Sequence, residues 1–224
     1  MLLINSNISL LHTGPFGVNT YIVPLDENRV FIVDPACCDY SHDTQVVTDF
    51  IKKNELDPVA IVLTHGHFDH VAGLPILRSE FPSLPIYIHE NDAHYVGKDS
   101  ASAHKEILTD MGFEAFITFV SNLPKPTELM HEGDLLFSSW KVIHTPGHTK
   151  GSCCLYCEEK KWLLSGDTVF YGSCGRTDLA GGSDSEMADS LKRLHSELPK
   201  DVRVFSGHGE VGFLLPQAGK FWGI

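Results

Sequence analysis

The stretch that decides the fold covers residues 64–70 and reads Thr64-His65-Gly66-His67-Phe68-Asp69-His70. It follows directly on a short, apolar, β-branched run at residues 59–63, which predicts a buried strand. The ligand-type side chains are spaced by two, two and one residues, so they share no helix face and differ from the helical zinc motif with its pair at i and i+4. A loop that curls around an ion can point all four side chains inward. The sequence therefore predicts a metal-binding loop with enough ligands to serve two adjacent ions.

Three further candidate ligands have the same local setting, each beside a glycine and just past a predicted strand: His148, Asp167 and His208. Active-site residues of α/β proteins collect at the carboxyl ends of strands, so four such loops can meet. Imidazole and carboxylate ligands without thiolate suit zinc, iron or manganese, and seven ligands exceed the four of a closed structural zinc site. We therefore expect two divalent metal ions that share a bridging aspartate, with zinc as the first expectation and iron or manganese as alternatives.

Short strand-like runs alternate with amphipathic helical runs along the whole chain, which predicts an α/β fold. Residues 19–23 and 30–33 are typical of a hairpin, and residues 41–54 are typical of a helix. Residues 184–198 predict another helix, because Ser183 and Glu186 have the spacing of a capping box. Its 224 residues fit a single domain, 1–224, in which a mostly helical block at about 91–125 forms an insertion.

The chain is acidic, with a formal net charge of −12 that disfavours binding to a phosphate backbone. No apolar run reaches about 18 residues, and the N-terminus lacks the charged region of a secretory signal. We therefore expect a cytoplasmic protein that binds neither nucleic acid nor membrane and acts on a small molecule. Its six cysteines are expected to stay reduced there, and a homo-oligomer is left open.

The motifs occur together in an order that resembles one known family. The chain resembles a metallo-β-lactamase-fold hydrolase and, more narrowly, the compact bacterial glyoxalase II group, the hydroxyacylglutathione hydrolases. The resemblance rests on Asp34-Pro35, the 64–70 loop, Pro146-Gly147-His148-Thr149, Gly166-Asp167-Thr168 and Gly207-His208-Gly209. It implies a four-layer αββα sandwich with the metals at one edge, between the two sheets.

The resemblance also implies how the ligands are shared. His65, His67 and His148 would hold one metal, whereas Asp69, His70 and His208 would hold the other, with Asp167 bridging. A hydroxide between two ions is available at neutral pH and would attack an acyl carbon. A thiolate leaves without a dedicated proton donor because thiols have a pKa near 8.5, so the chemistry fits a small thioester substrate.

Two residues receive roles beyond metal binding. Asp69 is the candidate catalytic residue, because it would orient the nucleophile or accept its proton. Arg176 occupies the place where glyoxalase II enzymes carry a basic residue, so the resemblance makes it the candidate substrate-binding residue. Only residues 210–224 follow the Gly207-His208-Gly209 motif of the last ligand, too few for the helical domain with which larger family members bind glutathione. The block at 91–125 or a second subunit is then expected to complete the pocket.

Four alternatives share parts of this pattern. A ribonuclease Z-like phosphodiesterase has a similar ligand set, and a persulfide dioxygenase would bind a single iron. True metallo-β-lactamase activity is less favoured because Asp167 lies where one lactamase class would place cysteine. A non-catalytic metal-binding module would be expected to lack ligands, and none is missing. Asp34 is expected either to orient the 64–70 loop or only to form a turn, and Cys154 and Cys157 are expected to pack in the core.

Overall fold

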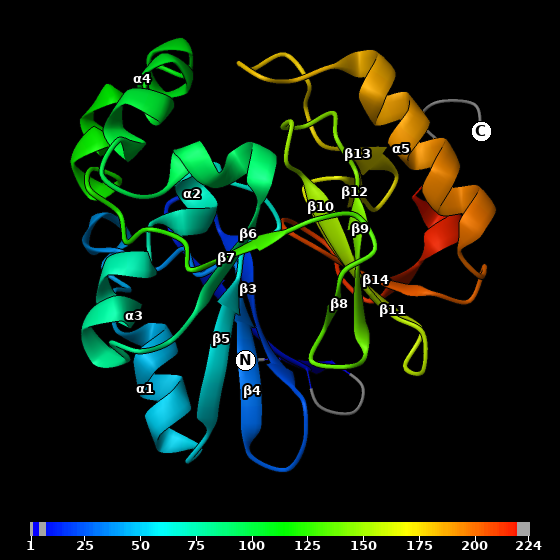
Figure 1. The fold of residues 1–224 in the computed structure, drawn as a ribbon, viewed down its shortest axis with the longest axis horizontal. Helices are drawn as coiled ribbons and strands as arrows, with labels where there is room; N and C mark the ends of the chain where they lie inside the picture. Colours follow the sequence, from blue (N-terminus) through cyan, green and yellow to red (C-terminus); the bar gives the residue numbers. More distant parts are fainter. Residues whose placement is uncertain (1, 5–7, 219–224) are drawn as a thin grey trace.

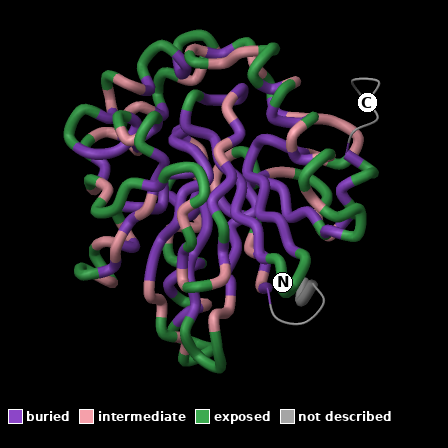
Figure 2. The backbone as a smooth tube through the Cα atoms, turned by 45° about the vertical axis from the view of Figure 1, so that its right-hand side comes forward, coloured by how far each residue is buried: buried purple, intermediate pink, exposed green. Residues whose placement is uncertain are grey.

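The computed structural model describes residues 2–4 and 8–218 and has four layers. Two β-sheets pack face to face, and helices cover the outer face of each sheet (Figure 1). The buried backbone is concentrated in the strands at the centre (Figure 2). This arrangement confirms the αββα sandwich that the resemblance implied.

The first sheet has seven strands, which follow one another across the sheet in chain order. Their bounds are β1 (Leu2–Ile4), β2 (Ile8–Thr13), β3 (Val18–Pro24), β4 (Arg29–Val33), β5 (Asp57–Val62), β6 (Ile86–His89) and β7 (Glu128–Met130). Strands β1 to β4 are antiparallel, and the predicted hairpin is formed by β3 and β4. Strands β4 to β7 are parallel, so their connections cross over the outer face of the sheet and carry its helices.

The second sheet has six strands in the order β15-β14-β11-β10-β9-β8. Their bounds are β8 (Leu135–Leu136), β9 (Trp140–His144), β10 (Cys153–Cys157), β11 (Trp162–Gly166), β14 (Arg203–Ser206) and β15 (Phe213–Leu214). Only the β11–β14 pair is parallel, and helix α5 (Asp184–Glu197) makes that crossover. A small hairpin of β12 (Val169–Phe170) and β13 (Ser173–Cys174) lies between β11 and α5 in the chain.

Alternation along the strands divides the apolar residues among three clusters. Tyr21 and Val23 of β3 face the second sheet, whereas Ile22 faces the helices on the other side. In β10, Cys154 packs against the α5 side and Cys157 packs between the sheets. Both cysteines are buried, which agrees with their predicted role in core packing.

The helices over the first sheet differ in one place from the sequence expectation. Helix α1 spans Val46–Lys53, and the residues before it form a short 3₁₀ turn, Asp39–Ser41. The Asp43 carboxylate accepts hydrogen bonds from the backbone N–H groups of Gly14 and Cys38, at 2.7 and 2.8 Å. Because these bonds hold the segment in a turn, the helix starts later than residue 41.

The block at 91–125 is mostly helical, as its sequence pattern predicted. It contains the 3₁₀ helices Glu90–Tyr95 and Glu114–Phe119 with α4 (Ser100–Asp110) between them. With α2 (Phe68–Val71) and α3 (Leu74–Glu80) it lies on the helical side of the first sheet (Figure 1). None of the helices in the described ranges combines the length and the apolar character that crossing a membrane requires.

Candidate metal centre

The ligand-type residues lie on four loops at one edge of the sandwich. Each loop follows a strand: the 64–70 loop follows β5, and the loops that carry His148, Asp167 and His208 follow β9, β11 and β14. The strands therefore place the four loops next to one another, as expected for residues at strand ends.

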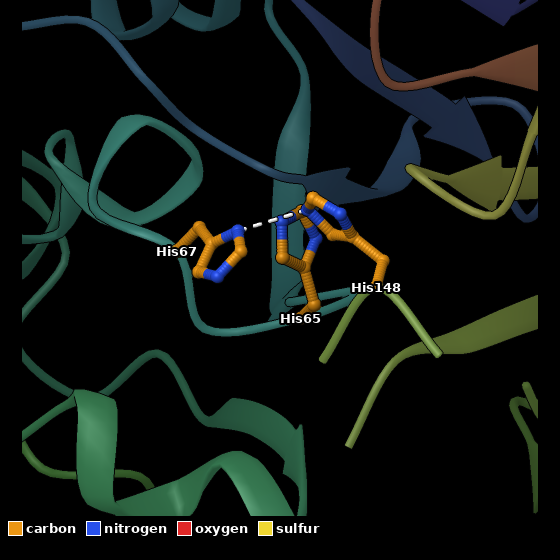
Figure 3. Close-up of side chains that lie close together, drawn as sticks. All are labelled: His65, His67 and His148. Carbon is orange, nitrogen blue, oxygen red and sulfur yellow. Dashed lines mark hydrogen bonds between the residues drawn. The ribbon is translucent and has the colours of Figure 1, made fainter. Parts of the chain in front are cut away.

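The first cluster consists of three buried histidines. The rings of His65, His67 and His148 point toward one another (Figure 3), and one ligand atom from each lies within 4.8 Å of the others. The Nδ1 atom of His67 lies 2.8 Å from Nε2 of His148. Burial, together with the neighbouring imidazoles, lowers the pKa values of His65 and His67 well below the ordinary histidine value. Both rings are therefore neutral and can each offer a lone pair.

The second cluster consists of Asp69, His70 and His208, whose ligand atoms also lie within 4.8 Å of one another. Nε2 of His208 lies 3.1 Å from Nε2 of His70 and 3.3 Å from Oδ2 of Asp69. Burial alone would raise the pKa of Asp69, but the imidazoles of His70 and His208 outweigh it and lower that pKa well below the usual range. Asp69 is therefore a carboxylate.

Asp167 faces both clusters. Its Oδ1 atom lies 3.4 Å from Nε2 of His70, and its Oδ2 atom lies 3.6 Å from Nε2 of His148 and 3.5 Å from Nε2 of His208. The structure thus brings together all seven residues singled out in the sequence. Their assignment as ligands of two particular ions stays a prediction.

Several buried polar atoms of the clusters lack a partner. Nε2 of His65, Nε2 of His67 and Oδ1 of Asp167 have no hydrogen-bond partner among the described residues. Unpaired polar atoms are costly in a protein interior unless another group satisfies them. A donor set of imidazoles and carboxylates is the set that zinc, iron and manganese prefer. The residues present therefore fit divalent cations.

A buried network fixes the orientation of two of the rings. Asp34 accepts hydrogen bonds from the backbone N–H of Thr64 at 2.8 Å, from the Thr64 hydroxyl at 2.6 Å and from Nδ1 of His70 at 3.0 Å. Because the Thr64 hydroxyl donates to Asp34, its lone pair can accept from Nδ1 of His65 at 3.2 Å. In both rings Nδ1 donates to this network, so Nε2 is the ligand atom, once His70 has released its second proton. Asp34 thus acts on the 64–70 loop, in line with the first of its two expected roles.

Burial would lower the pKa of His70, but Asp167, Asp69 and Asp34 outweigh it and raise that pKa to about 10. A proton on His70 therefore offsets part of the negative charge of the surrounding carboxylates. A divalent cation bound between them would take over this role, and its binding would release the proton.

The backbone of Arg176, the candidate substrate-binding residue, orients His148. Its Nδ1 atom donates to the carbonyl oxygen of Arg176 at 2.7 Å, which leaves Nε2 facing His67. The Arg176 guanidinium is half-exposed and forms two hydrogen bonds with Asp178, at 2.7 and 2.8 Å. The contact with His148 is one that the sequence did not indicate.

Two supporting residues of the 91–125 block were not identified from the sequence. The buried Asp92 carboxylate accepts from the backbone N–H groups of Gly66 and Gly151, at 2.9 and 2.7 Å, and so ties the loop of His65 to the loop of His148. Nε2 of the buried His104 ring lies 3.0 Å from the Gly66 carbonyl oxygen, a contact that the spacing of His104 in the sequence does not indicate. A Cβ atom at Gly66 would lie 2.5 Å from the Tyr95 ring, so the loop needs a glycine there.

The clusters open into a cavity of about 490 Å³. Its lining includes ligand-type residues from both clusters, Asp167 and Arg176. The remaining walls are largely apolar. A small molecule that enters this cavity reaches the side chains on which the chemistry depends.

The αββα sandwich, with its histidine and aspartate clusters at the edge between the two sheets, is typical of a class of metal-dependent enzymes. The family model described as the metallo-beta-lactamase superfamily matches residues 13–208. The chain belongs to this superfamily. It is 30% identical over 200 residues to the probable metallo-hydrolase YqgX of Bacillus subtilis (strain 168). The alignment covers 88% of this chain and 87% of that protein.

Two solved structures are similar over nearly their full length. The BLEG-1 B3 metallo-beta-lactamase has a TM-score of 0.80 and 29% identity, and the match covers 94% of this chain and 95% of that chain. The di-iron-bound form of TTHA1623 has a TM-score of 0.75 and 32% identity, and the match covers 93% of this chain and 96% of that chain. The likeness extends over the whole sandwich, and one of these relatives binds two iron ions.

Proposed function

We propose that this chain is a hydrolase with two divalent metal ions and that it cleaves small thioesters in the manner of the glyoxalase II group. The observation that carries the proposal is the pair of three-residue clusters, joined by Asp167, that contribute to the lining of a cavity. Seven imidazole and carboxylate ligands exceed what one tetrahedral ion needs. Two adjacent sites account for all of them.

His65, His67 and His148 would hold one ion, Asp69, His70 and His208 would hold the other, and Asp167 would contribute an oxygen to each. When bound, divalent ions supply a nucleophilic hydroxide at neutral pH and polarise the substrate carbonyl. Asp34, Thr64 and the Arg176 carbonyl keep the ligand nitrogens turned toward the centre.

Asp69 lines the cavity and is ionised, so it can accept a hydrogen bond from the attacking water and orient it. Its lowered pKa makes it a weak proton acceptor, so orientation is the role that we propose for it. A thioester suits the site because its leaving thiolate has a conjugate acid of pKa near 8.5 and departs without help from an acid. Arg176, at the cavity wall, is kept as the candidate contact for a polar part of the substrate.

The identity of the metal is part of the proposal. Imidazole and carboxylate ligands suit zinc, and the di-iron-bound form of TTHA1623 supports iron as the alternative. A persulfide dioxygenase would instead bind one iron and consume oxygen. The ratio of metal to protein therefore separates hydrolysis from oxidation.

Hydrolysis of β-lactams is the second candidate, because the BLEG-1 structure, a B3 metallo-beta-lactamase, is so similar in fold. A lactam nitrogen is a much more basic leaving group than a thiolate and needs a proton as it departs. A phosphodiester substrate is less favoured, since the net charge of −12 repels polyanions.

The decisive experiment combines elemental analysis with a substrate panel. We expect about two ions per chain and turnover of acyl-thioesters, with little turnover of β-lactams, phosphodiesters or persulfides. His67→Ala and Asp167→Ala should each lower thioester kcat/KM by more than about 100-fold, because each removes a ligand rather than a supporting contact. Exposed His12→Ala serves as the matched control and should keep both metals and activity. Full thioesterase activity in both ligand variants would contradict the mechanism.

A further inference from the structure

The cavity beside the metal centre has an apolar wall that the proposed chemistry does not use. Apolar side chains from well-separated parts of the chain form it: Phe16, Phe68, Met111, Phe170 and Leu179. Two of them lie close to the ligands. Phe68 stands between His67 and Asp69 in the chain, and the Phe170 ring centre is 6.3 Å from the ring of His208. A group attached to a carbonyl at the metals would therefore reach this wall directly.

The wall is partly buried and partly exposed. Phe68 is buried and packs edge-on against Phe16, with ring centres 5.6 Å apart. Phe16 also packs edge-on against Phe113, at 5.3 Å, yet 42% of its surface is exposed to solvent. Covering such a ring with an apolar ligand removes its exposed surface from water, which favours binding.

Apart from the proposed metal ions, the side chains of the cavity offer little positive charge to an anionic substrate. Among the described lining residues, Arg176 alone carries a permanent positive charge, and its Nε and Nη2 atoms already donate to Asp178. A glutathione carrier brings two carboxylates, and each would need a charged partner when desolvated. The cavity lining offers one such group, and that group is already engaged.

We propose that the site selects thioesters with an apolar acyl group, on the order of six carbons long, which packs against Phe16, Met111, Phe170 and Leu179. This inference rests on the proposed thioesterase function and narrows its substrate class. It makes the apolar wall, rather than Arg176, the main determinant of specificity.

The test uses thioesters of one neutral thiol, N-acetylcysteamine, with the metal-loaded enzyme. Across acetyl, butanoyl, hexanoyl and octanoyl substrates, kcat/KM should rise by about fourfold per methylene until the cavity is filled. Lactoyl and propanoyl thioesters of the same thiol differ by one hydroxyl group, and the propanoyl compound should be the better substrate. A flat series, or a preference for the lactoyl thioester of glutathione, would overturn the inference while leaving the thioesterase function intact.

Substitutions in the apolar wall test whether its side chains cause the preference for longer acyl groups. Met111→Gln and Phe16→Ser should each lower the hexanoyl-to-acetyl ratio of kcat/KM by about tenfold, as expected when an apolar contact with the acyl chain is lost. Leu135→Ser changes a 62% exposed leucine on the edge strand β8, outside this cavity, and should keep the ratio of the unmodified protein. Equal ratios in all three variants would show that the wall does not contact the acyl group.

A binding measurement separates this inference from the chemistry. Alkyl ketones in which a methylene replaces the thioester sulfur cannot be hydrolysed. Calorimetry should show that their affinity rises with chain length and that binding has a negative heat-capacity change, the mark of buried apolar surface. If no thioester were hydrolysed but these ketones bound as expected, the proposed function would fail and the apolar pocket would stand. If thioesters were hydrolysed and the ketone affinities did not vary, the pocket would fail instead.

Discussion

One carboxylate, Asp34, controls the orientation of side chains on either side of the ligand loop. It is 1% exposed, and its backbone has a positive φ of 50°, a conformation that non-glycine residues rarely adopt. In this position its oxygens receive hydrogen bonds from Thr64 and His70. The strained backbone is therefore retained at a residue whose side chain sets the geometry of the metal centre.

Asp34→Asn should weaken metal binding without unfolding the protein. The amide keeps the shape of the carboxylate, but its NH₂ group cannot accept the hydrogen bonds that Thr64 and His70 donate. We expect a 10- to 100-fold loss of metal affinity, which is about what a lost supporting contact costs, measured by competition with a chromophoric chelator. Asp26→Asn, in an exposed ion pair with Arg29, is the control. Unchanged affinity together with an unchanged melting temperature would refute the orienting role.

His89 should make the free energy of unfolding depend on pH. Burial and the stacked ring of His144, 4.1 Å away, lower its pKa from 6.5 to about 4. Protonation would also break the hydrogen bond that Nδ1 accepts from the backbone N–H of Asn91. Above pH 6.5 His89 is neutral in both the folded and the unfolded protein. Between pH 6.5 and pH 4 His89 takes up a proton only in the unfolded chain, so the free energy of unfolding falls as the pH falls.

His89→Gln lacks this titration. In metal-free protein, the difference in unfolding free energy between pH 7 and pH 4 should be about 3 kcal/mol smaller for the variant than for the unmodified chain. Urea unfolding at several pH values measures it, and exposed His12→Gln is the matched control. Parallel pH curves for the unmodified chain and His89→Gln would disprove the assignment.

At the residue scale, the sequence could indicate only groups whose role shows in local spacing. The histidines and aspartates of the 64–70 loop are close in the chain and could be recognised together. Asp92 and His104 reach Gly66 across 26 and 38 residues, so no local pattern marks their contacts. The carbonyl of Arg176 could not be found from residue types at all, because every residue has one.

At the scale of elements, helix α5 begins where its sequence indicated. Ser183 has an extended backbone, and its hydroxyl accepts from the backbone N–H of Glu186 at 3.3 Å. By contrast, the start of α1 depends on contacts of Asp43 with Gly14, far away in the chain. A local cap is visible in the sequence, whereas a tertiary contact that prevents helix formation is not.

Ser183→Ala should therefore destabilise the protein by about 1 kcal/mol, because it leaves an N–H group at the start of α5 unpaired. For a chain of this length, the melting temperature would fall by about 2–4 °C. Ser196→Ala, in the exposed last turn of the same helix, is the matched control and should have a smaller effect. Calorimetry distinguishes them, and an equal loss for both variants would contradict the cap.

At the scale of the whole molecule, the order of the motifs in the sequence predicts the layers of the fold, but it does not predict which strands pair within each sheet. Alternating strands and helices predict an α/β protein, and the resemblance supplied two sheets. That β11 pairs in parallel with β14 across helix α5 follows from packing between distant segments. This pairing places the loops of Asp167 and His208 side by side, and so completes the centre.

The metal centre joins loops from both sheets, so its occupancy should affect the stability of the entire sandwich. Without cations, the buried Nε2 atoms of His65 and His67 and Oδ1 of Asp167 have no hydrogen-bond partner among the described residues. With free zinc at 100 times its dissociation constant, each site should add about 2.7 kcal/mol to the free energy of unfolding. The melting temperature should then lie about 5–10 °C higher per occupied site than in chelator, as measured by scanning calorimetry. The double variant His67→Ala with Asp167→Ala should lose most of this shift, whereas His12→Ala should retain it. Equal melting temperatures with zinc and with chelator would mean that the clusters hold no ion in the folded protein.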